Sequence, residues 1–321
     1  LAAVRDARGM RHMKSDPVRT EFVEANGLVF ETDQCGDGNR LALFLHGFPE
    51  HSFSWRYQLP LLAELGYTAW APNMRGYGNS SSPHQIKDYA IESLMADVAG
   101  LMDASGFKEV VLIAHDWGAL IAWYFAMREI RPLERLIIMN VPHPGALAEK
   151  IKSLPAQLMK SWYIFFFQVP WLPELMFTAQ KAKGVGDAFV KMAIDKSRFP
   201  EEVLDVYRKN ALRPSGLKCM INYYRALVSG GGASRQRKLG FPVIDVPTLM
   251  IWGEEDTALD KRTTLGTERY VNDFTIRYLA NVSHWVQQEA PETVNAMIKA
   301  WLAGEPVPEA DGDGKTAERR R

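Results

Sequence analysis

Residues 110–124 read VVLIAHDWGALIAWY, and this stretch decides the fold. Its first five residues are apolar and mostly β-branched, which predicts a buried strand, whereas residues 119–127 have a helical pattern. Ala114 and Gly118 stand two places before and two places after Asp116. A strand, a tight turn and a helix with small residues at those places form a nucleophile elbow, in which the central side chain projects from the top of the sheet.

Asp116 occupies the central position, where an esterase would have serine. A serine that attacked a saturated carbon would leave an ether, which water does not readily cleave, whereas an aspartate leaves an ester that water can hydrolyse. The aspartate therefore favours displacement at saturated carbon followed by hydrolysis of an alkyl-enzyme ester. The turn alone leaves a second interpretation open, in which Asp116 caps the helix that follows a buried strand.

The composition excludes several function classes. The 321 residues are 47% hydrophobic and 24% charged, and 38 Lys and Arg residues balance 38 Asp and Glu residues, so nothing favours nucleic acid as a partner. Cys35 and Cys219 make neither a disulfide framework nor a metal-ligand spacing, which favours a reducing, cytoplasmic location. We find no apolar run long enough for a membrane span. Because the sequence begins at Leu1, an upstream signal or anchor is left open.

Alternating strand and helix patterns predict a mostly parallel α/β sheet. Asn26-Gly27 marks a hairpin between the first two strands. The expected strands are 20–25, 28–32, 40–45, 67–71, 110–114, 135–140, 248–252 and 274–279, and the expected helices around them are 54–65, 91–105, 119–127 and 291–302.

The pattern also divides the chain into segments. Between residues 143 and 240 we expect only helices, with Pro and Gly breaks, which indicates a helical cap over the sheet. We therefore expect a flexible arm, the first part of the α/β core, the cap, the second part of the core and a disordered tail, at residues 1–18, 19–142, 143–240, 241–303 and 304–321.

An ester on Asp116 needs a base that activates water, and histidine suits this role near neutral pH. His284 follows the last predicted strand, on a loop that lies at the carboxyl edge of a parallel sheet. The preceding strand ends in Glu254-Glu255-Asp256, from which we select Asp256 as the acid that orients the imidazole. Glu254 and Glu255 are expected to be solvated.

The sequence His46-Gly47-Phe48-Pro49 follows the first parallel strand, beside the elbow. The backbone N–H groups of Phe48 and Trp117 are candidates for an oxyanion hole, in which the oxyanion would be the carbonyl oxygen of Asp116 itself. The Phe48–Pro49 bond is a candidate cis peptide bond. We interpret His46 as a structural residue, although the motif alone is also compatible with an ordinary turn.

Taken together, seven motifs resemble the α/β-hydrolase fold epoxide hydrolases, both the soluble type and its single-domain relatives. The resemblance covers roughly residues 18–303. Ala114 stands where Gly is commoner in the family, a small difference that should still fit. The motifs are HGFPE (46–50), SWRYQLP (54–60), RGYGNS (75–80), AHDWG (114–118), NYYR (222–225), WGEEDTAL (252–259) and SHWVQQEAPE (283–292).

The resemblance implies that two cap tyrosines hold and protonate the epoxide oxygen. One matches Tyr224 in NYYR, and the other matches Tyr163 by its spacing to Gln168-x-Pro170. A phenol with a pKa of about 10 can donate to a developing alkoxide and remain protonated at neutral pH. Core packing is the better interpretation for Tyr223 and for residues 165–167, some of which should line the pocket. The residues expected to line the pocket are Phe48, Trp117, Phe166 and Trp285.

These residues predict an enzyme that converts an apolar epoxide to a vicinal diol without a metal or an organic cofactor, acting as a monomer or homodimer. A haloalkane dehalogenase would share Asp116 but would need a second halide donor, commonly Asn at the position of Phe48 or another cap Trp. This chain has Phe48, and it has the two cap tyrosines. A fluoroacetate dehalogenase should have Arg in place of Trp117, and a plain esterase should not have Asp116. A non-catalytic binding protein of the same fold is the alternative outside enzymes.

Overall fold

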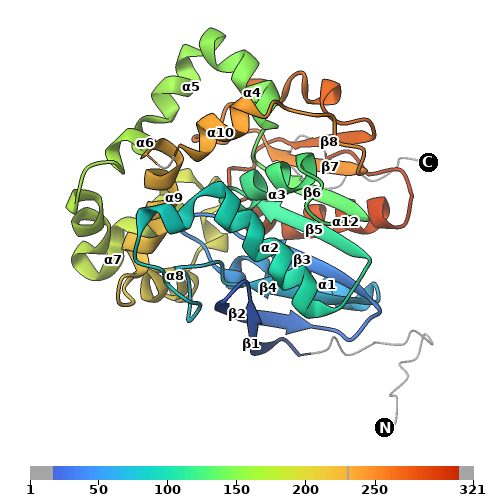
Figure 1. Ribbon diagram of the computed structural model, residues 1–321, viewed down its shortest axis with the longest axis horizontal. Helices are drawn as coiled ribbons and strands as arrows, with labels where there is room; N and C mark the ends of the chain where they lie inside the picture. The colour runs from blue at the N-terminus through green and yellow to red at the C-terminus, as the bar shows by residue number, and fades with distance from the viewer. Residues whose placement is uncertain (1–16, 230, 311–321) are drawn as a thin grey trace.

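The computed structural model describes residues 17–229 and 231–310, and the expected arm up to residue 16 lies outside them (Figure 1). Its strands form one eight-stranded sheet in the order β1-β2-β4-β3-β5-β6-β7-β8. The pairs β1–β2 and β2–β4 are antiparallel and all others are parallel, so the predicted mostly parallel sheet is confirmed. The strands are β1 Arg19–Ala25, β2 Leu28–Cys35, β3 Arg40–Leu45, β4 Tyr67–Pro72, β5 Val110–His115, β6 Arg135–Met139, β7 Thr248–Gly253 and β8 Phe274–Leu279.

Strand β5 lies at the centre of the parallel part, and all six of its residues are buried. Its neighbours β3 and β6 pair with it in register, with Leu43 opposite Leu112 and Ile113 opposite Ile137. A strand covered on both faces must be apolar throughout, which explains why residues 110–114 show no polar alternation.

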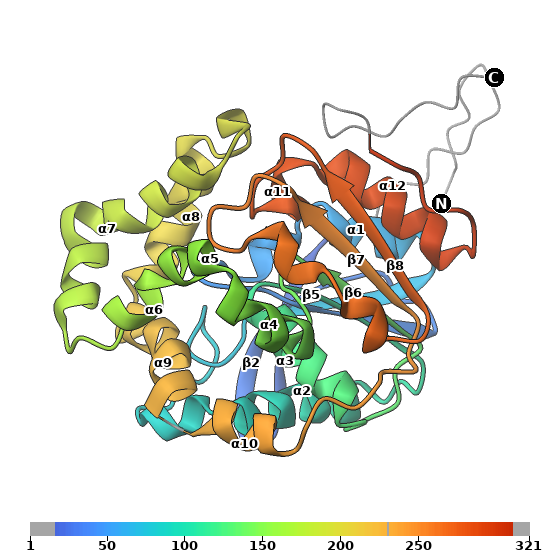
Figure 2. The same cartoon turned by 90° about the horizontal axis from the view of Figure 1, so that it is seen from above.

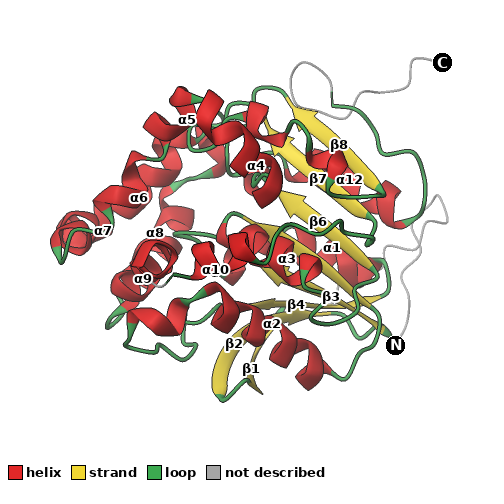
Figure 3. Cartoon of the chain, turned by 45° about the horizontal axis from the view of Figure 1, so that its top comes forward, coloured by secondary structure: helices red, strands yellow, loops and turns green. Residues whose placement is uncertain are grey.

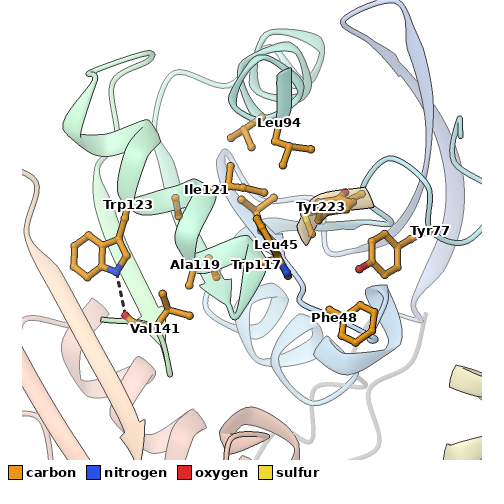
Figure 4. Close-up of a cluster of buried hydrophobic side chains, with 14 of the residues drawn as sticks. Leu45, Phe48, Tyr77, Leu94, Trp117, Ala119, Ile121, Trp123, Val141 and Tyr223 are labelled. Atoms are coloured by element: carbon orange, nitrogen blue, oxygen red, sulfur yellow. Dashed lines mark hydrogen bonds between the residues drawn. The ribbon is translucent and has the colours of Figure 1, made fainter. Parts of the chain in front are cut away.

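Helices cover both faces of this sheet (Figure 2). On one face α2 (Ile91–Ser105) and α3 (Trp117–Met127) pack on Leu112 and the other even-numbered residues of β5. On the other face α1 (Gln58–Glu64) and α12 (Pro291–Leu302) pack on its odd-numbered residues. Figure 4 shows the first layer, where Leu94 of α2 and Ile121 of α3 converge on Leu45.

A group of helices, which we call the cap, lies between β6 and β7 in the chain. It gathers beside one edge of the sheet (Figure 3). The part of the cap that the structure describes contains no strand, as the sequence pattern indicates. The cap helices are α4 Pro144–Lys150, α5 Pro155–Lys160, α6 Trp162–Phe166, α7 Leu172–Met192, α8 Glu201–Ala211, α9 Gly216–Ser229 and α10 Gly232–Lys238. Helix α7 is broken in its middle, where residues 179–182 have non-helical backbone angles.

The expected single helix over residues 54–65 is wrong. The structure has a 3-10 turn, Ser52–Trp55, followed by α1, which begins only at Gln58. Pro60 provides the physical reason. In a helix that began at residue 54, its missing N–H and its ring would fall in the helix interior, whereas a start at Gln58 places Pro60 in the first turn, where it is tolerated.

The expectation of a disordered tail from residue 304 also differs from the structure. Val307 is only 8% exposed, and its carbonyl oxygen accepts hydrogen bonds of 3.2 and 3.0 Å from the guanidinium of Arg277 on β8. Val307 and Ala310 therefore pack on the core, although residues 304–306 and 309 are exposed, and the rest of the expected tail lies outside the described residues. Among the helices of residues 17–229 and 231–310, none combines the length and the hydropathy needed to cross a bilayer.

Candidate active site

Asp116 lies between the end of β5 and the start of α3, with a positive φ of 48°. This sharp turn brings three chain segments together, so small residues are required around it. A Cβ at Gly118 would overlap the carbonyl oxygen of Leu45, and a Cβ at Gly47 would overlap the side chain of Asp116. Ala114 is fully buried and fits in the place where glycine is commoner.

The loop after β3 supplies a hydrogen bond to the Asp116 carboxylate. The backbone N–H of Phe48 donates to Asp116 Oδ1 at 2.7 Å. The second predicted oxyanion donor, Trp117, is the first residue of α3, so its N–H has no acceptor within that helix. The Phe48–Pro49 peptide bond is cis.

His46 holds this loop through both of its ring nitrogens. Nδ1 lies 3.0 Å from the carbonyl oxygen of Gly47, and Nε2 accepts a hydrogen bond of 3.0 Å from the backbone N–H of Met74. Burial lowers the pKa of His46 to about 4, because it outweighs the Gly47 hydrogen bond and the charges of Glu50 and Asp116, which raise that pKa. The ring of His46 is therefore neutral at pH 7. These contacts agree with the structural role expected of His46.

His284 lies between the two predicted carboxylates. Its Nδ1 is 2.6 Å from Asp256 Oδ2, and its Nε2 is 3.4 Å from Asp116 Oδ2. Asp256 is 3% exposed and its Oδ1 accepts two backbone N–H groups, from Ala258 at 2.7 Å and Leu259 at 2.8 Å. The loops after β5, β7 and β8 thus bring the three residues to the same edge of the sheet.

The three groups set one another's charge. Burial alone would raise the pKa of Asp116 and of Asp256, but the hydrogen bond and charge of His284 outweigh it and lower both values. Burial alone would lower the pKa of His284, but the two carboxylates outweigh it and raise that pKa to about 10. At neutral pH the arrangement therefore holds an ionised Asp116 beside an imidazolium.

The two other carboxylates after β7 lie away from this cluster, as expected. Glu254 forms an ion pair with Lys261 at 2.6 Å, and Glu255 is exposed. Of the three neighbouring carboxylates, Asp256 is the one that contacts His284.

Two phenols face the carboxylate from the cap. Tyr163 belongs to α6 and Tyr224 to α9, and their ring centroids are 5.8 Å apart, edge to face. Burial raises the pKa of each, and the charge of Asp116 raises it further, so both phenols stay protonated at neutral pH. Tyr223 points elsewhere, beside Trp117 in Figure 4, and its hydroxyl donates to the Arg75 carbonyl oxygen at 2.9 Å.

Asp116, Tyr163 and Tyr224 lie where two cavities meet. The larger, of about 700 Å³, also contains His284, and the smaller, of about 310 Å³, extends on the other side beneath α4 and α10. Most of the side chains along both walls are apolar.

The expected pocket residues are placed as follows. Phe48 and Trp285 line the larger cavity, and Trp117 lines the smaller one. The expectation for Phe166 is wrong, because its neighbour Phe167 lines the larger cavity instead.

The ring contacts of the two residues differ. Phe167 follows the last residue of α6 and packs between Phe48 and Tyr224, with ring centroids 5.3 and 4.8 Å away. Phe166 packs on Trp162, with ring centroids 5.8 Å apart. Phe165 is 69% exposed, so core packing is also wrong for that residue.

The sequence reasoning missed Asn140, which positions the acid. Its amide Nδ2 donates to Asp256 Oδ2 at 2.8 Å, and its Oδ1 accepts the Gly253 N–H at 2.9 Å. The available signal was its place at the carboxyl end of the predicted strand 135–140, between the strands of Asp116 and Asp256.

A buried network behind His284 was also missed. His115 Nδ1 lies 2.7 Å from Glu50 Oε2, and His115 Nε2 lies 2.8 Å from the carbonyl oxygen of His284. Gln287 and Gln288 donate to Glu50 Oε1 at 2.9 and 2.7 Å. Glu50 and His115 both belong to motifs quoted above, HGFPE and AHDWG, which was the only signal available.

Among the described residues there is no cluster of three His, Cys, Asp or Glu side chains that could hold a metal ion. The arrangement that is present is an ionised carboxylate, a histidine between two acids and two neutral phenols. It suits covalent catalysis at a carbon whose leaving group is an oxygen.

A sequence profile described as the alpha/beta hydrolase fold matches residues 43–291. The chain belongs to the α/β-hydrolase fold family. This α/β-hydrolase is 36% identical over 289 residues to the human protein named epoxide hydrolase 4, covering 88% of the chain and 78% of that relative. It is 34% identical over 295 residues to the AB hydrolase superfamily protein YfhM of Bacillus subtilis, covering 89% of the chain and 99% of that relative.

Solved structures of similar proteins are also epoxide hydrolases. A mutant of the epoxide hydrolase from Bacillus megaterium has a TM-score of 0.81 and 28% identity, covering 88% of this α/β-hydrolase and all (100%) of that chain. Epoxide Hydrolase A from Mycobacterium thermoresistibile has a TM-score of 0.79 and 29% identity, covering 91% and 100%.

The electrostatic coupling within the site leads to a testable prediction. In Asp116→Asn one of the two charges that raise the pKa of His284 is lost, so that pKa should fall below its value of about 10. An NMR titration of the His284 ring protons measures the change. Asp103→Asn, in an exposed ion pair with Arg131, is the matched control and should leave the pKa unaltered. An unchanged His284 pKa in Asp116→Asn would contradict the coupling.

Proposed function

We propose that this α/β-hydrolase converts an apolar epoxide and water to a vicinal diol through a covalent ester on Asp116. One observation supports this above all others: an ionised carboxylate at the elbow faces two protonated phenols across the point where two apolar cavities meet. The relatives named epoxide hydrolases support the same reaction. No metal or cofactor takes part in it.

In the first step Asp116 attacks one epoxide carbon. We assign the attack to Oδ2, because Oδ1 accepts the hydrogen bond from Phe48. The new carbon–oxygen bond forms as the ring carbon–oxygen bond breaks, and the freed oxygen becomes an alkoxide. Tyr163 and Tyr224 hold that oxygen and supply its proton, which they can do because burial keeps them protonated.

In the second step the ester is hydrolysed. Once Asp116 is alkylated, its negative charge is gone, so the pKa of His284 falls and the ring gives up its proton, which replaces the one that the phenols lost to the alkoxide. Neutral His284, oriented by Asp256, then removes a proton from water, which attacks the ester carbonyl carbon. The resulting oxyanion forms where Phe48 and Trp117 present their backbone N–H groups. Collapse of this intermediate breaks the bond between the carbonyl carbon and the diol oxygen, which takes the proton from the His284 imidazolium. The acid left on Asp116 carries the water oxygen and returns its own proton to His284.

Dehalogenation of a haloalkane is the second candidate function, since Asp116 could displace halide in the same way. The two phenols favour an epoxide over a haloalkane as the substrate. An alkoxide must gain a proton, which the phenols can supply, whereas a departing halide needs only N–H or similar donors. The side chain of Phe48 supplies none, but Trp117 and Trp162 line the cavities, so the two phenols decide between the reactions.

Several broader expectations remain part of the proposal. We propose that residues 143–240 act as the cap between the core segments 19–142 and 241–303. A reducing, cytoplasmic location is inferred from the cysteine content, and the monomer or homodimer is a prediction about assembly.

The direct test is diol formation from a panel of apolar epoxides, such as styrene oxide and a fatty-acid epoxide. The parent protein should produce diol, and Asp116→Ala should produce none, because no ester can form. Chromatography of the diol measures the reaction. Halide release from chloroalkanes, in the absence of diol from any epoxide, would replace the proposal with the dehalogenase.

The division of roles between the two steps predicts a trapped intermediate. His284→Gln should leave the attack by Asp116 largely intact but slow the hydrolysis, because glutamine cannot remove a proton from water. Intact-mass measurement after addition of epoxide should then show the protein heavier by one substrate molecule. Asp116→Ala/His284→Gln is the control without adduct, and an absent adduct in the single variant would refute this assignment of His284.

The two phenols predict a specific loss of rate. Tyr224→Phe and Tyr163→Phe each remove one donor to the alkoxide and should lower kcat for the epoxide by about 100-fold. Steady-state kinetics measures the loss. Tyr270→Phe removes a phenol that is paired with Glu149 outside both cavities, and its kcat should be that of the parent. Unaltered kcat in both cap variants would remove the phenols from the mechanism.

A further inference from the structure

Helices α5 to α7 expose an unusual set of apolar side chains. Six large hydrophobic residues between positions 159 and 176 are 56–77% exposed. Elsewhere among the described residues, only Phe22 and Leu239 reach that exposure. We call this set the apolar lip, and its members are Met159, Trp162, Phe165, Trp171, Leu175 and Met176.

The apolar lip lies at the periphery of the molecule, away from the sheet. Helices α5, α6 and α7 form the outer margin of the cap in Figure 1, and α6 and α7 lie at the left edge of Figure 2. Isolated exposed hydrophobic residues are ordinary, but six of them within 18 residues, on or beside three consecutive helices, favour an interaction site.

The side chains of this surface fit a lipid bilayer. Three of its members, Trp162, Phe165 and Trp171, are aromatic. Aromatic side chains are favoured at the level of lipid headgroups, where the ring contacts the acyl boundary and the indole N–H of a tryptophan stays hydrated.

The charge of the surrounding segment is positive. Residues 151–191 contain five lysines and two acids. Glu174 pairs with Arg225 at 2.6 Å, outside the segment, whereas Asp187 is shared by two of the five lysines, Lys183 at 2.8 Å and Lys191 at 3.4 Å. The segment therefore keeps more positive than negative charge. An apolar surface flanked by an excess of lysine suits anionic lipid.

The apolar lip also continues into the larger cavity. Trp162 and Met176 line that cavity as well as the surface, and Asp116 lies in its wall. A bilayer bound to the lip would therefore cover the mouth of the cavity and place its acyl region against apolar walls.

We propose that this protein binds the surface of bilayers that contain anionic lipids through the apolar lip. Binding would let an apolar ligand pass from the bilayer to Asp116 without crossing water. Docking of a second copy is less compatible with the charges, because a symmetric dimer would bring the lysines of one lip towards those of the other. The binding itself does not depend on which reaction Asp116 performs.

Vesicle sedimentation with the full chain tests the proposal. The parent should sediment with vesicles of phosphatidylcholine and phosphatidylserine, more weakly with phosphatidylcholine alone, and less as salt is raised. Phe165→Ser/Trp171→Ser removes two lip side chains that do not line the cavity, and should weaken binding by about tenfold or more. Phe22→Ser/Leu265→Ser, which removes two similarly exposed residues elsewhere, should bind as the parent does.

Lys181→Glu provides an independent variant, since Lys181 is exposed and lies outside the cavity wall. It should reduce binding to the anionic vesicles and leave the weak binding to neutral vesicles unchanged. No sedimentation of the parent with either vesicle, or equal binding by parent and Phe165→Ser/Trp171→Ser, would overturn the proposal.

Two further measurements distinguish lipid binding from self-association and from catalysis. If the parent forms a dimer that Phe165→Ser/Trp171→Ser, the lip variant, does not form, and the parent does not bind vesicles, the lip is a self-association surface. That result would reject the proposal that the lip binds a bilayer. Diol formation from a small water-soluble epoxide should be equal in the parent and the lip variant. Its absence from both would count against the proposed reaction and leave the vesicle result unaffected.

Discussion

The imidazole of His284 lies between two buried carboxylates, and the charge of each member depends on the other two. Alone in that environment, each group would tend to lose its charge. Together they keep Asp116 ionised, the state in which a carboxylate can attack carbon. Because the three groups come from the ends of β5, β7 and β8, the cluster exists only while these strands keep their order and register.

The cap adds what the sheet cannot supply. The sheet edge contributes charged groups and backbone N–H donors, whereas the cap contributes the neutral phenols of Tyr163 and Tyr224 and most of the apolar wall. The negative charge of Asp116 and the protonated state of the phenols support each other, since the charge raises the phenol pKa values. The same cap carries apolar side chains on its outer margin, so the interior site and the exposed surface share α6 and α7.

Local sequence patterns identified most of the core correctly because they act over a few residues. The strand–turn–helix around Asp116 and the Asn26-Gly27 hairpin are short-range features, and the structure has both. Errors arose where a long-range contact or a local exception decided the outcome. Because of Pro60, the helix expected from residue 54 begins only at Gln58. Arg277 on β8 donates a hydrogen bond to Val307, a residue that composition alone assigns to a disordered tail.

By itself, the sequence determined the parallel α/β class, the aspartate at the elbow and the chain order of Asp116, Asp256 and His284. Each of these follows from a short motif or from the order of the predicted strands. Only the tertiary structure decided that Asn140 holds Asp256, that Phe167 rather than Phe166 faces the substrate cavity, and that His115 binds the carbonyl oxygen of His284. These contacts join residues far apart in the chain or depend on how a helix is rotated, and neither distance nor rotation is encoded in a local pattern.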